Sequence, residues 1–371
     1  MILPNHLAAE IRKFPHRLCG LKLIFKKKKS FFKTQKKGEV MKKWMKLVIV
    51  VAAFSMLFVM GCKDDSSDPN VSSFETLTAY MDANGMTTTD LLASWIIAPD
   101  SLIQVLDQNY VMDIRAGDYH GATAADPADG IVDYENGHIP GAVASSLGNI
   151  LVDAALADKP IVVVCYTGQS AGHAVMALRL SGYEARVLKW GMSGWNLDFD
   201  KWSGKTATLN HANWVAAPGA IEASEVFEYP EFESDLEDGA AILAERVAYL
   251  LAEGFKSVKA LDGDTTIGAL DNPGDFFINN FWSADDVIDY GNITGAYRIN
   301  PLVLENLDPN EIVVTYCWTG QTSSMITAYL TVLGYDARSL SFGANGMIYD
   351  DLLGHKWSAT GITNQTYDVG P

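Results

Sequence analysis

Residues 161–170 read IVVVCYTGQS and residues 313–322 read VVTYCWTGQT, so the chain contains one short pattern twice. In each copy a β-branched apolar run leads to a cysteine, a turn with a glycine and then a helical pattern. A continuous apolar run of this length is typical of a strand buried on both faces of a parallel sheet. The turn then lies at the carboxyl end of the strand, where open α/β sheets keep their sites. The sequence therefore predicts two candidate sites, centred on Cys165 and Cys317.

The turn has the backbone of an anion site. We expect its N–H groups, with those of the next helix's first residues, to point toward the cysteine sulfur. Such a cradle favours a thiolate, a persulfide or a bound oxyanion. The alternative is that each cysteine has only a structural role, because cysteine is often buried in protein cores. Two cysteines in the same position, in a chain with only four, favour a functional role.

The repeat extends well beyond the two turns. An offset of 152 residues separates Cys165 from Cys317, and the same offset separates several later pairs. These are Gly182 and Gly334, Tyr183 and Tyr335, Arg186 and Arg338, Gly191 and Gly343, and Gly194 and Gly346. Upstream the offset grows, because residues 121–135 read as an inserted loop. The self-similarity predicts two consecutive domains built alike.

We predict a division of the chain into six segments. They are an upstream extension and signal peptide at 1–61, a polar tether at 62–73, a first domain at 74–205, an acidic and mobile or surface-lying linker at 206–238, a second domain at 239–361 and a tail at 362–371. Within the first domain we expect a helix from Thr88 through Trp95 and a strand at 110–112.

Three further segments flank the first cysteine. Asp113-Ile114-Arg115 ends the strand at 110–112, GHIPGA occupies residues 137–142, and GMSGW occupies residues 191–195. In this order and spacing they resemble the rhodanese family of sulfurtransferases. The resemblance implies an α/β fold of two tandem rhodanese-like domains, each a mostly parallel sheet flanked by helices.

The resemblance also implies an activity. It is the transfer of sulfane sulfur from a small donor, such as thiosulfate, mercaptopyruvate or polysulfide, to a thiophilic acceptor through a cysteine persulfide. Cys165 is then the leading nucleophile and Cys317 a second or vestigial one, although tandem family members often keep only the C-terminal cysteine active. No cofactor is implied. A non-catalytic sulfur-binding or interaction module and a thiol redox sensor remain open as alternatives.

The other residues of the two loops are the expected substrate contacts. They are Tyr166, Thr167, Gly168, Gln169, Ser170, Trp318, Thr319, Gly320, Gln321 and Thr322. Their side chains are all neutral, whereas family members specialised for thiosulfate often carry a basic residue here. Thiosulfate preference is therefore not predicted. A class of phosphatases with a related loop needs an arginine near its end, where this chain has Ala171 and Gly172.

Asp113, Arg115 and His138 are the expected supporting residues of the first site. Asp113 and Arg115 can pair beside the loop, and His138 can fix a turn. We expect His173 on the surface of its helix. The second repeat differs at the corresponding positions, which are Asn280, Trp282 and Asn292. These differences favour the first site, and no metal-ligand cluster is evident.

The N-terminus has the pattern of an export signal. Residues 41–46 read MKKWMK, an apolar stretch follows through residue 60, and Gly61 precedes Cys62. The pattern resembles a bacterial lipoprotein signal in which Cys62 accepts lipid and translation begins at Met41. A plain signal peptide and an uncleaved anchor helix remain as alternatives. The expected location is the cell envelope, facing the periplasm, with the outer membrane slightly favoured by Lys63.

Charge and cysteine use limit the partners. Residues 1–61 hold 14 of the 28 Lys and Arg and only 2 of the 45 Asp and Glu, so the rest of the chain carries a net charge of −29. Such an acidic protein repels nucleic acid and anionic membrane surfaces. The expected partners are a small sulfur-containing substrate and a membrane reached through the lipid anchor, and a protein partner is left open. A disulfide between Cys165 and Cys317 is not expected, since each lies in its own domain.

Overall fold

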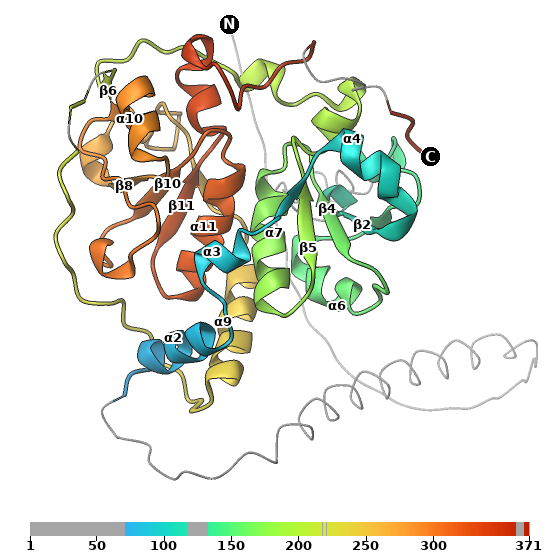
Figure 1. Ribbon diagram of the computed structural model, residues 1–371, viewed down its shortest axis with the longest axis horizontal. Coiled ribbons are helices and arrows are strands. Elements are labelled where there is room, and N and C mark those ends of the chain that lie inside the picture. Colours follow the sequence, from blue (N-terminus) through green and yellow to red (C-terminus); the bar gives the residue numbers. More distant parts are fainter. Residues whose placement is uncertain (1–70, 117–132, 217, 220, 361–366, 371) are drawn as a thin grey trace, which may run out of the picture. The chain divides into compact units, whose positions relative to one another are not determined.

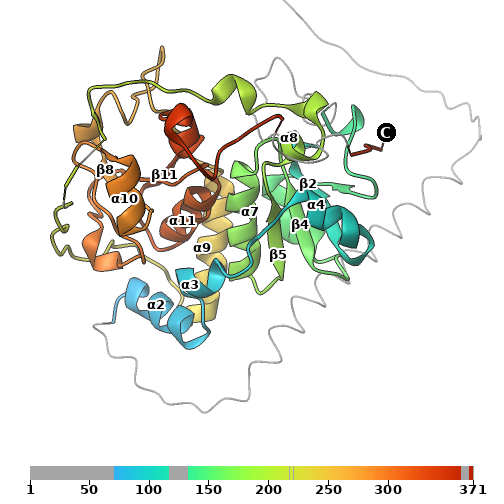
Figure 2. The same cartoon turned by 45° about the horizontal axis from the view of Figure 1, so that its top comes forward.

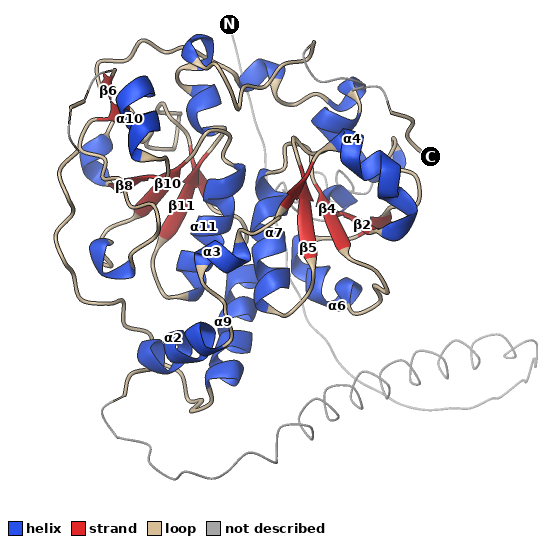
Figure 3. Ribbon diagram, in the orientation of Figure 1, coloured by secondary structure: helices blue, strands red, loops and turns tan. Residues whose placement is uncertain are grey.

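The structure is a computed structural model, and it describes residues 71–116, 133–216, 218–219, 221–360 and 367–370 (Figure 1). These residues fall within one compact unit, Asp68–Pro371. Two sheets of parallel strands organise this unit, and helices flank both sheets (Figure 3). The predicted α/β class with mostly parallel sheets is confirmed. Cys62 and the predicted signal peptide lie outside the described residues.

The first sheet has the order β1-β5-β4-β2-β3. Its strands are β1 (Ile96–Ile97), β2 (Tyr110–Asp113), β3 (Val143–Ala144), β4 (Ile161–Val164) and β5 (Ala185–Leu188). All its pairings are parallel. Strand β4 is the central one, and its alternate residues enter two different apolar cores, one on each face of the sheet. This explains why its sequence is apolar throughout.

The second sheet repeats this order as β7-β11-β10-β8. Its strands are β7 (Ser257–Val258), β8 (Phe277–Asn280), β10 (Val313–Tyr316) and β11 (Ala337–Leu340), again all parallel. A bridge between Asn279 and Tyr297 takes the place of a fifth strand. Strands β6 (Trp214–Val215) and β9 (Asn292–Ile293) form a separate antiparallel pair. The prediction that Cys165 and Cys317 each follow a central strand is confirmed.

Helices α7 (Gln169–Leu180) and α11 (Gln321–Val332) follow the two cysteine loops and pack against each other between the sheets (Figures 1 and 2). Helix α9 (Gly239–Glu253) lies against both of them. Gly172 permits the close approach of α7 to α11, because a Cβ there would lie 2.1 Å from the Oγ atom of Ser324. The two halves thereby share one apolar core.

Shorter helical segments complete the fold. The α-helices are α2 (Ser73–Ala83), α3 (Thr88–Leu91), α4 (Pro99–Leu102), α6 (Ile150–Ala154), α8 (Met192–Trp195) and α10 (Ala284–Tyr290). The 3-10 segments are Ile103–Gln108, Ile114–Ala116, Leu147–Asn149, Leu197–Phe199, Ser203–Lys205, Pro273–Asp275, Leu304–Asn306, Gly343–Gly346 and Tyr349–Asp351. Among the described residues no helix is both long and apolar enough to cross a membrane.

The segment after Thr88 differs from the prediction. The expected helix through Trp95 stops at Leu91, and Ser94 adopts a positive φ of 49° before strand β1 begins. Strand β1 forms because its two isoleucines pair with β5, a partner that lies far along the chain. The predicted acidic linker holds no helix or strand from residue 221 to 238 and is mostly exposed.

Candidate active site

The Cys165 sulfur lies in the cradle that the sequence predicts. Cys165 directly follows β4, and the backbone N–H of Gly168 donates to its Sγ atom over 3.1 Å. Gly168 has a φ of 80°, the left-handed conformation that favours glycine, and α7 begins at the next residue. The sulfur therefore faces a backbone donor near the positive end of a helix. Both features stabilise an anion at this position.

The turn at residues 191–195 holds the backbone of the Cys165 loop in place. The backbone N–H of Met192 donates to the carbonyl of Cys165 over 2.8 Å, and the hydroxyl of Ser193 donates to the carbonyl of Tyr166. Gly191 comes so close that a Cβ there would lie 2.3 Å from the same Cys165 carbonyl. The GMSGW segment thus fixes the loop's backbone.

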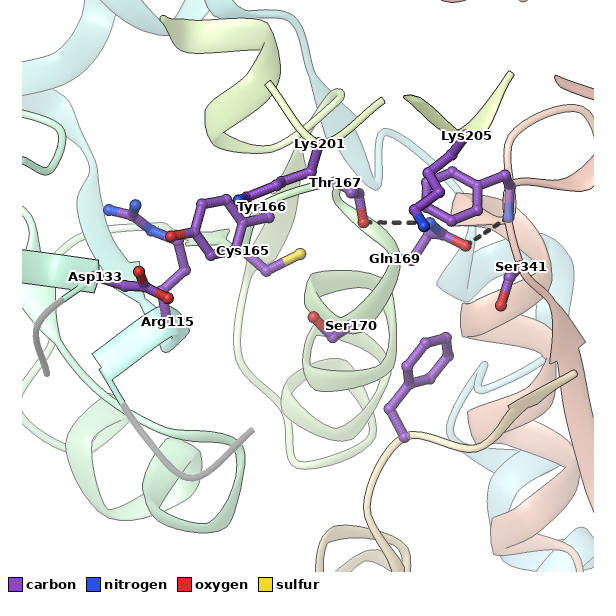
Figure 4. A pocket seen from close by; sticks show the side chains of 12 residues that line it. Arg115, Asp133, Cys165, Tyr166, Thr167, Gln169, Ser170, Lys201, Lys205 and Ser341 are labelled. Carbon is purple, nitrogen blue, oxygen red and sulfur yellow. Dashed lines mark hydrogen bonds between the residues drawn. The ribbon is translucent and has the colours of Figure 1, made fainter. Parts of the chain in front are cut away.

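Cys165 lines a cavity of about 440 Å³ (Figure 4). The predicted loop residues that share this lining are Tyr166, Thr167, Gln169 and Ser170. Other parts of the chain supply Arg115, Asp133, Lys201, Lys205, Phe255, Ser341 and Phe342. Cys165 itself is only 3% exposed, so the cavity is the approach to its sulfur.

Three cations reach this cavity although its loop carries none. Arg115 and Lys201 lie 5.1 and 5.2 Å from the centroid of the Tyr166 ring, and Lys205 lines the wall farther along (Figure 4). Sequence reasoning missed Lys201 and Lys205, which follow the GMSGW segment. The sequence did offer one indication of these two residues. Lys and Arg are scarce after residue 61, so two lysines within ten residues of the GMSGW segment stand out.

Asp113 and Arg115 form the predicted pair at the end of β2. Arg115 donates to both carboxylate oxygens of Asp113, with a shortest distance of 2.6 Å, and also to the carbonyl of Gly137. Both side chains are buried. Burial alone would lower the pKa of Arg115, but the bonds to Asp113 outweigh it, and the pKa is raised. The guanidinium therefore keeps its charge beside the cavity.

The hydroxyl of Tyr166 is affected by two charged side chains, Asp133 and Arg115. Burial raises the pKa of its hydroxyl, Asp133 adds to the rise, and Arg115 opposes it. The phenol therefore stays protonated at neutral pH. It can donate a hydrogen bond but cannot act as an anionic base.

His138 has a fixed position outside the cavity lining. Its ring stacks on that of Tyr134 at 3.9 Å, and its Nδ1 atom lies 3.1 Å from the carbonyl of Tyr134. Its backbone pairs with Gly370 near the C-terminus. These contacts agree with the predicted turn-fixing role.

The Cys317 loop has the same backbone with different surroundings. The Sγ atom of Cys317, which is 2% exposed, accepts from the backbone N–H of Ser323 over 3.4 Å. Beside it the ring of Trp318 stacks on Trp282 at 4.1 Å and on His355 at 5.3 Å. The indole of Trp282 therefore lies directly beside this loop.

Neutral groups replace the charged pair in the second repeat. Asn280 donates to the side-chain oxygen of Asn292, and the hydroxyl of Tyr316 donates to the same oxygen over 2.7 Å. Asn292 in turn donates to the carbonyl of Ala296. This network contains Asn280 and Asn292, the counterparts of Asp113 and His138, while Trp282 is the counterpart of Arg115.

The loop glutamines join the two halves. The side-chain oxygen of Gln169 accepts from the backbone N–H of Phe342 over 2.8 Å. Reciprocally, Gln321 donates to the carbonyl of Thr167 over 3.2 Å. Thr319 accepts from the backbone of Gln321, and Thr322 is half-buried on α11. Gln321 thus links the second loop to the first, and Gln169 links the first loop to the segment after β11.

The predicted surface position of His173 is wrong. The side chain is 1% exposed and lies edge-on to Phe255, with ring centroids 5.8 Å apart. Within the described part of the chain neither ring nitrogen has a hydrogen-bond partner. Burial lowers the pKa of His173 to about 4. The backbone of Leu250 acts in the opposite direction and raises this pKa by less. The helix has no free face at this position, because α7 packs between its sheet, α9 and α11.

Both loop cysteines are free thiols. In the described ranges no group of three or more His, Cys, Asp or Glu side chains is placed to hold a metal ion.

A comparison with known protein families finds a match within the first half of the chain. Residues 98–198 match the family model described as the rhodanese-like domain, and no curated protein matches the chain. This match supports a sulfur-transfer role at the level of the family.

Several solved structures are similar in part. A thiosulfate sulfurtransferase from Pseudomonas aeruginosa is 15% identical over 77% of this chain and 48% of its own, with a TM-score of 0.24. A 3-mercaptopyruvate sulfurtransferase from Leishmania major is 13% identical over 68% and 72%, with a TM-score of 0.27. A rhodanese-related protein from Thermoplasma volcanium is 19% identical over 27% and 88%, with a TM-score of 0.22. TM-scores this low say nothing about substrate or mechanism.

Proposed function

We propose that this chain, whose residues 98–198 are rhodanese-like, transfers sulfane sulfur through a persulfide on Cys165. One observation carries the proposal. The sulfur of Cys165 receives a backbone N–H at the start of a helix and opens into a cavity with cations on its wall. A backbone cradle stabilises the thiolate, and the cations favour an anionic donor.

The reaction is a double displacement. The Cys165 thiolate attacks the outer sulfur of thiosulfate, the sulfur–sulfur bond of the donor breaks, and sulfite leaves with the bonding electrons. A nucleophilic acceptor such as cyanide then attacks the outer sulfur of the persulfide, which gives thiocyanate and restores the thiolate. No oxidant or reductant is consumed. Arg115, Lys201 and Lys205 supply the positive charge that the neutral loop lacks.

The second half of the chain is the proposed partner domain of a tandem protein, with boundaries near 74–205 and 239–361. The support is the shared strand order and the equivalent positions of Cys165 and Cys317. The indole stack at Trp318 favours a secondary role for Cys317.

The test begins with the intact protein and its mass. After exposure to thiosulfate, mercaptopyruvate or polysulfide, we expect a gain of one sulfur atom on Cys165 and its loss on addition of cyanide. A folded protein that gains no sulfur from any donor would favour the binding-module alternative. Sulfenic acid or disulfide in place of the persulfide would favour the redox sensor.

A second proposal concerns location. The succession of charged, apolar and small residues before Cys62 supports a periplasm-facing lipoprotein of the cell envelope. In a bacterial host, Cys62→Ser should release the protein from the membrane fraction or block processing of its precursor. Fractionation with immunoblotting checks this. Unchanged processing and membrane retention would contradict the lipid anchor.

A further inference from the structure

The peptide group that joins Thr167 to Gly168 forms hydrogen bonds on both of its sides. Its N–H, which belongs to Gly168, donates to the Sγ atom of Cys165 over 3.1 Å. Its carbonyl, which belongs to Thr167, accepts from the side-chain amide of Gln321 and from the indole of Trp202, each over 3.2 Å. In a trans peptide the N–H and the carbonyl point in opposite directions. The two donors at the carbonyl therefore hold the N–H against the sulfur.

Gln321 comes from the second half of the chain, where it is the first residue of α11 and only 1% exposed. Its amide nitrogen packs tightly on the first loop, since a Cβ on Gly168 would lie 1.9 Å from it. A close-packed amide of this kind has little freedom to move away from the carbonyl. Hydrogen bonds in a chain also polarise one another. The donation from Gln321 thus strengthens the donation of the same peptide group to the sulfur.

The equivalent glutamine of the first half uses its side chain differently. Gln169 donates to the hydroxyl of Thr167 in its own loop over 3.2 Å (Figure 4). Its side-chain oxygen accepts from the backbone N–H of Phe342. The sulfur of Cys317 accepts from the backbone N–H of Ser323, which lies within α11. Both glutamine amides therefore donate to Thr167, one to its carbonyl and one to its hydroxyl, and both bonds support the first loop.

Building on the proposed sulfur transfer, we propose that Gln321 is a positioning residue for Cys165, which it serves by holding the Thr167–Gly168 peptide with its N–H on the thiolate. The second half of the chain then contributes to the first site without using its own cysteine. Removal of the Gln321 donor leaves the carbonyl with the Trp202 indole alone and weakens the polarisation of the N–H. The thiolate becomes less stable relative to the thiol, and the thiolate is the form that attacks a sulfur donor.

Alkylation of Cys165 by iodoacetamide tests the proposal, because this neutral reagent reacts with the thiolate and not with the thiol. The full-length protein is alkylated across a pH series, and peptide mapping by mass spectrometry gives the rate at Cys165 separately from the other cysteines. Gln321→Met keeps the length of the side chain and has no donor. We expect the midpoint of the pH profile to rise by about 0.5–1 pH unit, so that alkylation below the midpoint slows by roughly three- to tenfold. The plateau at high pH should stay within about twofold of wild type, since the thiolate is then fully formed in both proteins.

A second variant removes the other donor to the same carbonyl. Trp202→Phe lacks the indole N–H and keeps an aromatic ring against Phe342, so its profile should shift in the same direction. Ser203→Ala is the matched control. It removes a hydrogen bond between the two halves, from the indole of Trp357 to the Ser203 hydroxyl over 3.1 Å, and leaves Thr167 unchanged. Its profile should match that of wild type. Circular dichroism and thermal unfolding verify that each variant is folded.

Two results would overturn the proposal. One is a pH profile of folded Gln321→Met that superimposes on that of wild type. The other is a shift in Ser203→Ala as large as that in Gln321→Met, which would assign the effect to the interface as a whole. If Gln321→Met does not fold, Trp202→Phe decides, and an unchanged profile in that variant overturns the proposal.

Persulfide mapping on the same proteins separates this proposal from sulfur transfer. A shifted alkylation profile in a protein whose Cys165 gains no sulfur from any donor means that sulfur transfer fails and the positioning of the thiolate stands. A persulfide that forms equally fast in wild type and Gln321→Met, with equal alkylation profiles, means that sulfur transfer stands and the role of Gln321 fails.

Discussion

The loops at Cys165 and Cys317 have nearly the same backbone, and they differ in what surrounds them. Gly168 and Gly320 adopt φ values of 80° and 76° and directly precede α7 and α11. Each cysteine sulfur accepts a backbone N–H of its own loop or helix. Because the short loop sequence fixes this geometry, the geometry alone cannot rank the two sites.

The surroundings do rank them. At Cys165 a buried ion pair and two lysines leave an open cavity with positive charge on its wall. At Cys317 the rings of Trp282, Trp318 and His355 stack beside the loop, and neutral amides replace the charged pair. The two loops share their backbone, so we expect any difference in the reactivity of the two cysteines to come from residues outside each cysteine's own loop.

Serine substitutions test this ranking with the largest expected effect. Cys165→Ser should lower sulfur transfer by at least about 100-fold, because serine has neither the acidity nor the affinity for sulfur that a persulfide carrier needs. Cys317→Ser should change the rate by less than about twofold, as a shape-preserving change outside the reacting cavity. Steady-state turnover with three donors and persulfide mapping by mass spectrometry check both expectations.

One result would reverse the assignment. Full activity in Cys165→Ser together with none in Cys317→Ser would show that the indole stack does not block the second site.

The second prediction compares the charged pair of the first repeat with the amides of the second. Asp113→Ala leaves the buried guanidinium of Arg115 without its carboxylate, which should lower the free energy of unfolding by about 3–5 kcal/mol. Asn280→Ala removes one neutral hydrogen bond and should cost about 1–2 kcal/mol. Urea unfolding of both variants measures the difference.

A double variant is the control for this comparison. Asp113→Ala with Arg115→Met removes both charges and should recover part of the lost stability, because no unpaired charge stays buried. Equal losses in Asp113→Ala and Asn280→Ala would mean that the ion pair is no more important to the fold than an amide contact.

The sequence predicted the parts of this structure that depend on local patterns. The apolar runs before Cys165 and Cys317 indicated central strands, and the 152-residue offset indicated the repeated strand order. The pairing of Asp113 with Arg115 followed from their closeness in the chain.

Other features depend on segments that meet only in the folded chain. Lys201 and Lys205 reach the cavity because the segment after α8 folds back over the loop, and no spacing rule links them to Cys165. Strand β1 forms because its residues hydrogen-bond to the free edge of β5. His173 was misplaced because α9, which belongs to the second half, covers the face of α7 that would otherwise meet solvent.

The third prediction concerns His173 and its counterpart Met325, which lie at equivalent positions of α7 and α11. The folded-state pKa of His173 is lowered to about 4, below the usual histidine value of 6.5. The unfolded chain therefore takes up a proton as the pH falls through 6.5, while the folded protein does so only near pH 4. The free energy of unfolding therefore decreases progressively as the pH falls from 6.5 to 4, because the unfolded chain is protonated at His173 and the folded chain is not.

His173→Met should remove that loss, since the repeat already buries a methionine at the matching position. Relative to the variant, the wild-type protein should lose up to about 3 kcal/mol of unfolding free energy between pH 6.5 and pH 4. The carboxylates titrate in both proteins, so the difference between two denaturation series isolates the imidazole. Met325→Leu serves as the control, because it changes a buried side chain of α11 without adding or removing a titrating group. Parallel pH profiles for wild type and His173→Met would mean that the imidazole gains a proton inside the fold without penalty, and that α9 does not keep it in an apolar environment.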